Sequence, residues 1–387
     1  MLVREIVICG LAVLAVSVAS DRLYFGFWTF PPYQWLYFNI SASLAVFYGH
    51  MPWHYYLSQG VPLLTTTFLP FALVGLYKAA SSAKGPATLQ SNTLNTLALS
   101  ALVMITSLSL IAHKEVRFIY PLLPILHILA APYITAFFTT PSTASQQQPI
   151  TLRHKPALAT ILTLNLLLAG YLTLLHQPAP ISVLSFLRHS FETLHPDALT
   201  ITSPLPSSPG SEQKEDSELE LFALFLTPCH TTPWRSHLIY PALRARALTC
   251  EPPLHTAPGS AERENYLDEA DRFYLPSSTD DGDYGVPFLS QEIWPLLSSK
   301  EGTTGERRRG GEVPRYIVGF EGIEPVLHRF FGTGAKDGKE GSREEAPGQG
   351  MGVRLTRVWA GWNGAFNEDW RRRGRLVVWD TGVYGDS

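Results

Sequence analysis

The sequence predicts a polytopic α-helical membrane protein with a soluble α/β or α+β domain in its C-terminal half. Three observations lead to this fold class. Residues 1–178 contain nearly all the long apolar runs and few acidic side chains, whereas residues 211–387 hold most of the charge. Glycine and proline occur throughout the second region, and its apolar runs are short enough for strands. We therefore expect a transmembrane region at residues 1–178 and a soluble domain at residues 179–387.

Five apolar runs are interpreted as membrane spans, since a helix needs about 20 apolar residues to cross a bilayer. The first run, at residues 6–19, follows Arg4 and Glu5 and also has the features of a signal peptide. We expect it to be retained as a helix, because further spans follow. The other spans are expected at residues 55–77, 94–112, 118–138 and 157–175.

An aromatic stretch separates the first two spans. Residues 21–37 read DRLYFGFWTFPPYQWLY, and the adjacent Pro31 and Pro32 are not expected to continue a helix. Amphipathic rings favour the headgroup layer of a membrane, so we interpret the stretch as an interfacial loop that lines a site. Residues 36–48 are apolar but too short to span, and we expect an interfacial or re-entrant segment there. The candidate interface residues of the aromatic stretch are Arg22, Tyr24 and Trp28.

The distribution of lysine and arginine predicts the orientation of the spans. With five spans, the N-terminus and the loops at residues 78–92 and 139–155 lie on one side of the membrane. These segments are almost free of acid, so we expect them on the cytoplasmic side. The loop at residues 20–53, the turn at residues 113–117 and the chain after residue 178 then share the lumenal side. The basic residues on the expected cytoplasmic side are Arg4, Lys78, Lys84, Arg153 and Lys155.

A charged turn lies between the third and fourth expected spans. His113, Lys114, Glu115 and Arg117 place four ionisable side chains within five positions. Arginine offers a planar fork for phosphate oxygens and lysine a compact cation, while histidine can donate a hydrogen bond or relay a proton. Glu115 can hold a neighbouring cation in position. The residues alone favour a short turn whose charges face water or lipid headgroups, and the alternative is a binding site for the phosphate of a membrane lipid.

The polar half holds two cysteines, Cys229 and Cys250. Either they form a disulfide, which an oxidising lumen would allow, or they are two free buried thiols. Cys9 lies in an apolar run and is expected to be a small buried hydrophobe. The histidines near Cys229 and Cys250 do not have a zinc-binding spacing, so no metal site is expected. The acidic cluster at Asp268, Glu269 and Asp271 is interpreted as a solvated helix face.

Three apolar runs in the polar half predict strands, at residues 219–226, 315–320 and 376–379. Segments rich in glycine and charge near residues 200–215, 300–313 and 333–350 are expected to be disordered spacers. In the membrane region, His54 and His127 are candidates to line a cavity, because a histidine inside a span is unusual. The chain has no basic stripe with interleaved aromatic residues, so no nucleic acid partner is expected.

The motif HKEVRFIYPLLP, at residues 113–124, resembles the H-K-E-x-R-F signature of the endoplasmic reticulum mannosyltransferases that use dolichyl-phosphate mannose, members of the GT-C superfamily. Segments such as DRLYFGFWTFPPYQWLYFN, LTPCHTTPWRSH and RYIVGFEGIEP are similar to the fungal GPI mannosyltransferases that add the third mannose. The resemblance covers most of residues 21–330. It implies a GT-C-like, multi-pass protein of the endoplasmic reticulum membrane with a lumenal C-terminal domain.

The resemblance also implies an activity and its partners. Mannose moves from dolichyl-phosphate mannose, the lipid donor, to a GPI glycolipid acceptor, and an α-1,2 linkage forms in the lumen. The motif residues His113, Lys114, Glu115 and Arg117 then bind the donor's phosphate. The resemblance implies no nucleotide and no firm cofactor, and it does not decide whether a metal takes part. Other GPI-assembly proteins are further candidate partners.

One departure from the family concerns the catalytic base. Family members carry additional N-terminal spans and an acidic motif in the first lumenal loop, and no H-P-D-E-type segment precedes the first span of this chain. The nearest lumenal acid is Asp21, whose alternative role is an ion pair with Arg22 at a helix end. We therefore expect the chain to correspond to the C-terminal part of such an enzyme. The alternative function is a truncated, non-catalytic membrane protein that binds a lipid phosphate as a scaffold or partner.

Overall fold

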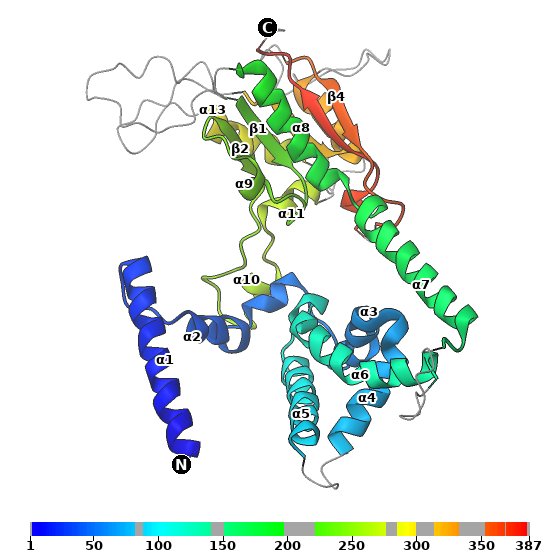
Figure 1. Ribbon diagram of the computed structural model, residues 1–387. Coiled ribbons are helices and arrows are strands. Elements are labelled where there is room, and N and C mark those ends of the chain that lie inside the picture. The colour runs from blue at the N-terminus through cyan, green and yellow to red at the C-terminus, as the bar shows by residue number, and fades with distance from the viewer. Residues whose placement is uncertain are drawn as a thin grey trace. The chain divides into compact units, whose positions relative to one another are not determined.

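The computed structural model describes residues 2–81, 88–140, 151–196, 221–275, 285–298, 313–332, 353–367 and 369–384. The chain forms two compact units (Figure 1). The first comprises Met1–Leu167 together with Pro252–Tyr266, and the second comprises Leu168–Glu251 together with Leu267–Ser387. The division lies near the boundary expected at residue 178, but residues 252–266 belong to the first unit. The three segments expected to be disordered spacers lie outside the described residues, except for Val313.

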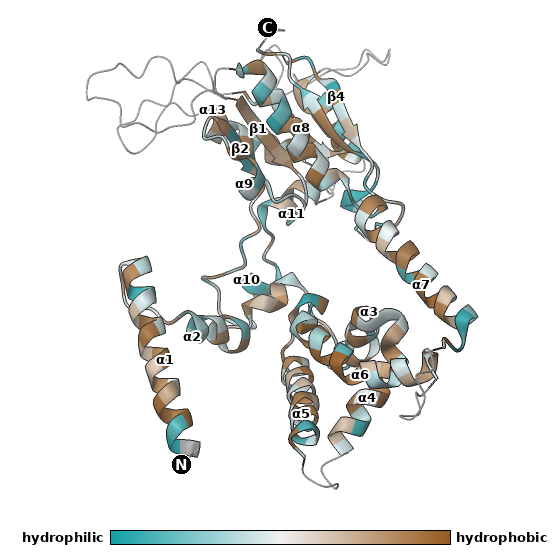
Figure 2. Cartoon of the chain, in the orientation of Figure 1, coloured by the Kyte–Doolittle hydropathy of each residue, from teal (hydrophilic) through white to brown (hydrophobic). Residues whose placement is uncertain are grey.

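Membrane-type helices dominate the first unit. Five helical segments of the described chain are long and apolar enough to cross a membrane: Arg4–Phe25, Tyr56–Ser81, Leu89–Ser109, Val116–Phe138 and Lys155–Leu175. They agree with the five spans expected from the sequence. Figure 2 shows the apolar residues along α1 (Leu2–Phe25), α5 (Leu89–Ser109) and α7 (Lys155–Gly170), the last continuing as η7 (Tyr171–Leu175).

Two of these spans are built from short pieces. The second consists of η3 (Tyr56–Gly60), α3 (Val61–Thr65), η4 (Thr66–Phe68) and α4 (Leu69–Ser81), and the fourth consists of η6 (Val116–Leu122) and α6 (Leu123–Phe138). Pro62 is the second residue of α3 and Pro70 the second residue of α4. Proline is tolerated at a helix start because the missing N–H would be unpaired there. The prolines therefore mark joints between helical pieces.

The first span differs from the expectation at its C-terminal end. Because α1 runs to Phe25, the aromatic stretch expected to be a loop from residue 21 begins inside this helix. Pro31 and Pro32 then start α2 (Pro31–Leu36), which η1 (Tyr37–Ser41) and η2 (Leu44–Tyr48) follow. The expectation that Cys9 is buried is wrong: Cys9 is exposed, because α1 is exposed along its apolar length.

Small residues bring α4, α5 and α6 together. A Cβ added at Gly75 would lie 2.2 Å from the carbonyl oxygen of Leu129, so the approach of α4 to α6 requires glycine at this position. Ala72, Ala98 and Ala101 are buried at the same helix contacts. Lipid gives membrane helices no hydrophobic driving force to associate, so close packing through small side chains replaces it.

The second unit is built on a five-stranded mixed sheet in the order β2-β1-β3-β5-β4. β1 pairs in parallel with β2 and β3, while β5 pairs antiparallel with β3 and β4. Figure 1 shows the sheet with helix α8 (Ala179–Leu194) across it. The strands are β1 (Leu221–Leu226), β2 (Leu243–Ala247), β3 (Tyr316–Phe320), β4 (Thr356–Gly361) and β5 (Leu376–Asp380).

Helices cover both faces of this sheet. Successive side chains of a strand point to opposite faces, so Ala223 and Phe225 pack with α8, while Leu224 and Leu226 pack on the other face. Central strands that are covered on both sides are continuously apolar, which explains why the sequence predicted β1, β3 and β5. Other helices in the described part of this unit are α9 (Trp234–His237), α11 (Glu269–Tyr274), α12 (Val286–Phe288), η9 (Leu289–Ile293), α13 (Trp294–Ser298), η10 (Glu321–Ile323), α14 (Glu324–Phe331) and η11 (Trp370–Arg372).

Candidate functional site

The charged turn follows α5, ends inside η6 at Arg117, and is tied to the loop that follows the first span. The N–H of Met51 donates to the carbonyl oxygen of Ala112 at 3.0 Å. His113 places Nδ1 3.0 Å from the carbonyl oxygen of Gly49 and Nε2 2.9 Å from Oε1 of Glu115. Both partners are acceptors, so the ring donates to both only when each nitrogen carries a proton. His113 thus links the turn to Gly49.

Lys114 is buried beneath this turn, with 3% of its surface exposed. Its Nζ donates to the carbonyl oxygens of Met51 at 3.0 Å and Ile111 at 2.5 Å. Burial lowers the pKa of the Lys114 ammonium. In the part of the chain that the structure describes, no carboxylate pairs with Lys114. Lys114 thus anchors the turn from inside, whereas the sequence predicted that it binds the donor's phosphate.

Arg117 is the exposed cation of the turn, with 68% of its side chain accessible. Its Nη2 donates to Oε1 of Glu115 at 2.7 Å, and its Nε contacts Oε2 of the same carboxylate. Burial acts to raise the pKa of Glu115, but hydrogen bonds from His113 and Arg117 and their charges outweigh it, so the pKa lies below its usual value. Glu115 is therefore a carboxylate that orients the exposed guanidinium.

Sequence reasoning missed the two residues that hold the turn in place, Gly49 and Met51. Both act through backbone carbonyl oxygens, which every residue carries, so no side-chain pattern could have identified them. The ring of Tyr48 also approaches that of His113, with 6.4 Å between centroids. The loop at residues 48–51 and the turn at residues 112–117 therefore form one structural site.

The candidates of the aromatic stretch form their own small group. The guanidinium of Arg22 lies 5.9 Å from the ring centroid of Trp28, a cation–π contact. Tyr24 is 84% exposed and packs edge-on against Phe25. Asp21 makes no ion pair with Arg22 among the described residues, and no described contact joins this group to the charged turn.

His54 and His127 are both exposed and bonded within their own segments. Nδ1 of His54 lies 3.1 Å from Oγ of Ser58. Nδ1 of His127 lies 2.8 Å from the carbonyl oxygen of Leu123, and its ring packs on Phe68 at 4.3 Å. Among the contacts described for these residues, none joins either ring to the charged turn.

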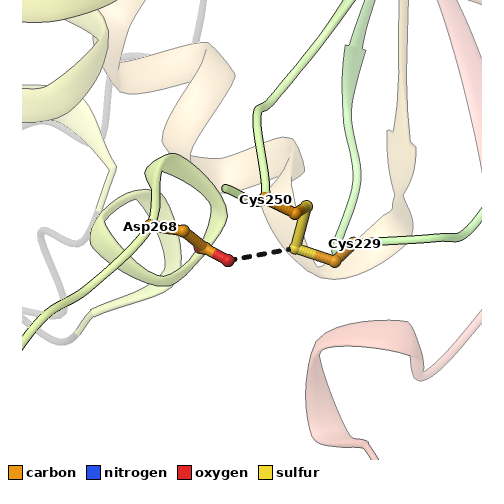
Figure 3. A group of neighbouring side chains, drawn as sticks. All are labelled: Cys229, Cys250 and Asp268. Atoms are coloured by element: carbon orange, nitrogen blue, oxygen red, sulfur yellow. Dashed lines mark hydrogen bonds between the residues drawn. A yellow bond between two sulfur atoms is a disulfide. The ribbon is translucent and has the colours of Figure 1, made fainter. Parts of the chain in front are cut away.

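In the second unit, Cys229 and Cys250 form a disulfide (Figure 3). Each cysteine lies three residues beyond the carboxyl end of its strand, β1 or β2. Because these strands are parallel neighbours, their carboxyl ends meet at one edge of the sheet. The bond therefore ties together the two segments that leave this edge, and the disulfide alternative of the sequence analysis is the one observed.

Asp268 lies against this disulfide, and only 4% of it is exposed. Its Oδ1 accepts a hydrogen bond from the N–H of Asp271 at 2.7 Å, which caps α11. Its Oδ2 lies 3.2 Å from Sγ of Cys229. A disulfide sulfur has no proton to donate, so a hydrogen bond forms across this contact only when the carboxyl is protonated. Burial, together with the charge of Asp271, raises the pKa of Asp268. The expectation of a solvated acidic face is therefore wrong for Asp268.

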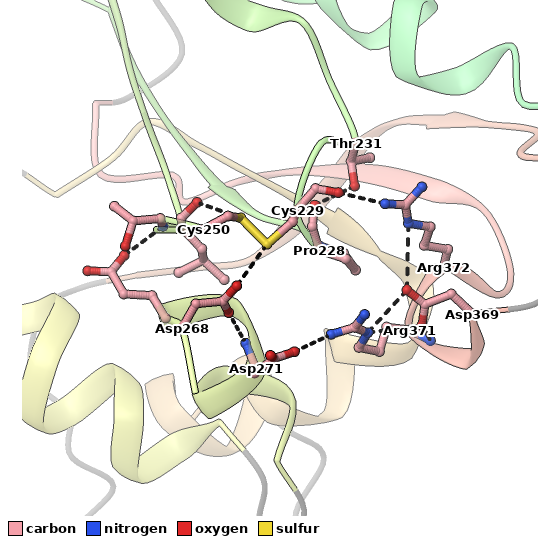
Figure 4. The surroundings of a disulfide bond; sticks show 12 residues. Pro228, Cys229, Thr231, Cys250, Asp268, Asp271, Asp369, Arg371 and Arg372 are labelled. Atoms are coloured by element: carbon pink, nitrogen blue, oxygen red, sulfur yellow. Dashed lines mark hydrogen bonds and ion pairs between the residues drawn. A yellow bond between two sulfur atoms is a disulfide. The ribbon is translucent and has the colours of Figure 1, made fainter. Parts of the chain in front are cut away.

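Charged residues continue this cluster toward η11 (Figure 4). Arg371 donates to Oδ1 of Asp271 at 2.7 Å and to Oδ1 of Asp369 at 2.9 Å. Arg372 donates to the carbonyl oxygen of Cys229 at 2.6 Å. The sequence analysis missed these arginines, although the run WRRRG that contains them was visible. Together they fasten the disulfide edge of the sheet to a segment some 140 residues later in the chain.

The ligand atoms of Cys229, Cys250 and Asp268 lie within 4.8 Å of one another, a spacing that a metal ion could bridge. Zinc binds cysteine as the thiolate. Because the two sulfurs are bonded to each other, this group cannot act as a thiolate site while the disulfide is intact.

A comparison with known protein families finds a match that includes the membrane spans and the charged turn. Residues 1–239 match the model of the Alg9-like mannosyltransferase family. The chain belongs to the Alg9-like mannosyltransferase family. The matched region includes all five candidate spans, the charged turn and strand β1.

Individual relatives narrow the similarity within this mannosyltransferase family. The chain is 52% identical over 392 residues to GPI mannosyltransferase 3 of Gibberella zeae, which covers 100% of the chain and 58% of that relative. It is 41% identical to GPI mannosyltransferase 3 of Aspergillus fumigatus, over 98% of the chain and 47% of the relative. It is 31% identical to human GPI alpha-1,2-mannosyltransferase 3, over 69% of the chain and 39% of the relative. The chain spans about half the length of the curated relatives it matches, and no solved structure matches it.

Proposed function

We propose that this chain transfers mannose from dolichyl-phosphate mannose to a GPI-anchor precursor, adding the third mannose through an α-1,2 linkage. The observation that carries the proposal is the similarity to GPI mannosyltransferase 3 over the whole chain, including the charged turn. The human relative is a GPI alpha-1,2-mannosyltransferase, and this similarity supports the α-1,2 linkage. A lipid donor and a GPI glycolipid acceptor are the partners that such a reaction requires.

Arg117 is the residue of the turn that best fits a donor phosphate. Its guanidinium is exposed and is held by Glu115, so its fork is oriented before a ligand arrives. Transfer of the mannose leaves a lipid phosphate, and a cation placed where that negative charge develops lowers the barrier. His113 and Lys114 then support the position of the turn, while Arg117 contacts the phosphate. This division of roles refines the expectation that all four motif residues bind the donor.

The catalytic base and any metal are not assigned. Asp21 is the candidate base from the sequence, and the guanidinium next to it in the chain, Arg22, contacts Trp28 rather than Asp21. No described contact joins Asp21 to the charged turn. The proposed chemistry therefore rests on the turn alone.

We place the charged turn and the sheet on the lumenal side of the endoplasmic reticulum membrane. The basic loops at residues 78–92 and 139–155 favour the cytoplasmic side. The loop at residues 48–51 contacts the turn at residues 112–117, which supports the parity count that puts both on one side. The disulfide between Cys229 and Cys250 also favours an oxidising compartment for the second unit.

Complementation tests this function in cells. Cells that lack the enzyme for the third mannose accumulate a GPI intermediate with two mannoses and lose GPI proteins from their surface. Expression of this chain should restore surface GPI proteins, and an Arg117→Gln variant should not. Arg153→Gln is the matched control, because Arg153 is an exposed arginine in a different loop. If neither the chain nor its control variant rescues while both still bind the donor lipid, the scaffold alternative holds.

A further inference from the structure

A hollow of about 370 Å³ lies in the first unit, between the segment after the first span and residues 253–266. Its volume falls within the range of about 300–1,000 Å³ of small-ligand pockets. Figure 1 shows α10 (Ala261–Glu264), the helix of the later segment, beside the ribbon that follows α2. The lining residues that matter for its chemistry are Val46, Phe47, Arg263, Glu264 and Tyr266.

Specific contacts hold the two walls of the hollow together. Nη2 of Arg263 donates to the carbonyl oxygen of Ala42 at 2.6 Å, across 221 residues of sequence. The rings of Phe47 and Tyr266 meet edge to face, with 5.8 Å between centroids. The N-terminal cap of α10 is Ser260, whose hydroxyl accepts from the N–H of Arg263. Residues 253–266 are thus fixed against the first unit, which explains why they belong to it.

The hollow is connected to the charged turn through a short row of rings. Phe47 packs against Tyr48 at 5.2 Å, and Tyr48 approaches His113 at 6.4 Å. The loop before the second span, the turn after the third and the segment after the fifth all follow odd-numbered spans. They therefore lie on the same side of the membrane whichever way the chain is oriented. A ligand in the hollow therefore lies on the same side of the membrane as the proposed donor site.

The chemistry of the walls fits a sugar. Aromatic rings offer apolar faces to the C–H groups of a pyranose, and a carboxylate and a guanidinium offer an acceptor and several donors to its hydroxyls. Glu264 is exposed and has no ion pair within the described chain, and Arg263 uses one N–H group on Ala42. An acyl chain would leave the carboxylate of Glu264 without a partner, and a phosphate would face that carboxylate.

We propose that this hollow binds the mannose residues of the glycolipid acceptor, an inference that rests on the proposed function for the identity of the acceptor. The donor phosphate at Arg117 and the acceptor glycan at Glu264 then occupy neighbouring parts of one unit. Phe47 and Tyr266 position the sugar rings, and Glu264 accepts hydrogen bonds from their hydroxyls.

Direct binding to the full chain in lipid nanodiscs tests the proposal without requiring activity. The probe is α-linked mannobiose, with cellobiose as the control sugar, and the readout is saturation-transfer NMR or calorimetry. Glu264→Gln should weaken mannobiose binding about tenfold, and Val46→Trp, which fills the mouth of the hollow, should abolish it. Glu262→Gln is the matched control: it removes a charge from the same helix, at an exposed residue outside the hollow, and should leave binding within about twofold.

The outcomes separate this inference from the proposed function. If the wild-type chain does not bind mannobiose, or if all three variants bind as the wild type does, the hollow is not a glycan site. In the second case mannose transfer by the same variants can still be normal, which leaves the proposed function intact. If Glu264→Gln and Val46→Trp lose binding but the wild-type chain transfers no mannose, the glycan site stands and the proposed function falls.

Discussion

The Lys114 ammonium lies 3.0 Å from the carbonyl oxygen of Met51, a residue 63 positions earlier in the chain. This contact gives the two cations of the charged turn different roles. Lys114 is buried and bonded to the backbone, whereas Arg117 is exposed and oriented by Glu115. Experiments can separate these roles, because replacing Lys114 should reduce stability, whereas replacing Arg117 should reduce donor binding.

Replacing Lys114 with methionine should destabilise the first unit. The substitution keeps the length of the buried chain but leaves the carbonyl oxygens of Met51 and Ile111 without their donor, at a cost of about 2 kcal/mol. The thermal unfolding midpoint of the chain in detergent should fall. An unchanged midpoint would show that the two hydrogen bonds do not hold the turn.

Arg117→Gln should leave the thermal unfolding midpoint unchanged and weaken binding of the donor lipid. Loss of a charged, oriented fork should raise the KM for dolichyl-phosphate mannose about tenfold, and Arg117→Lys should recover part of the loss. Initial rates over a series of donor concentrations give this value. If the KM of Arg117→Gln equals that of the control Arg153→Gln, Arg117 does not bind the donor.

Asp268 should give the stability of the second unit a distinctive pH dependence. Its pKa is raised in the folded protein, so between the unfolded value of about 3.9 and the folded value the native state holds a proton that the unfolded state has lost. This carboxyl therefore lowers the free energy of unfolding as pH rises through that window. Asp268→Asn keeps the cap of α11 and carries no charge, so its stability relative to the wild type should increase with pH. Parallel profiles from pH 4 to 7 would contradict a raised pKa for Asp268.

The disulfide should contribute about 3 kcal/mol, the value that chain entropy gives for a loop of this length. Cys229 and Cys250 are 21 residues apart in sequence. The double variant Cys229→Ser/Cys250→Ser should unfold at a lower temperature than the wild type, and mass spectrometry of non-reduced peptides should find the two cysteines joined. Two alkylatable thiols in the purified chain would contradict both the bond and the lumenal placement it supports.

Sequence patterns predicted the elements that long apolar runs define. The five spans and the strands β1, β3 and β5 were predicted because each is apolar over its whole length. β2 and β4 were missed because they form the sheet edges, where polar residues such as Arg244 and Arg246 alternate with apolar ones. The motif predicted which residues form the turn but not which of its cations is buried.

The features of the structure that sequence patterns could not predict depend on backbone contacts between distant segments. The carbonyl oxygens of Gly49 and Met51 hold the charged turn in place. The carbonyl oxygen of Ala42 accepts the hydrogen bond that holds Arg263. A carbonyl oxygen has no sequence signature. For the same reason the sequence placed residues 252–266 in the soluble domain, whereas the structure packs them with the first unit.

Direct assay of mannose transfer tests the central claim. The chain in nanodiscs is given labelled dolichyl-phosphate mannose and a GPI intermediate that carries two mannoses, with microsomes as the positive control. We expect a product that is longer by one mannose, sensitive to α-1,2-mannosidase and reduced in amount by Arg117→Gln. The proposed function is contradicted if the chain forms no such product from an acceptor that the microsomes extend, or if it forms the product from GDP-mannose without the lipid donor.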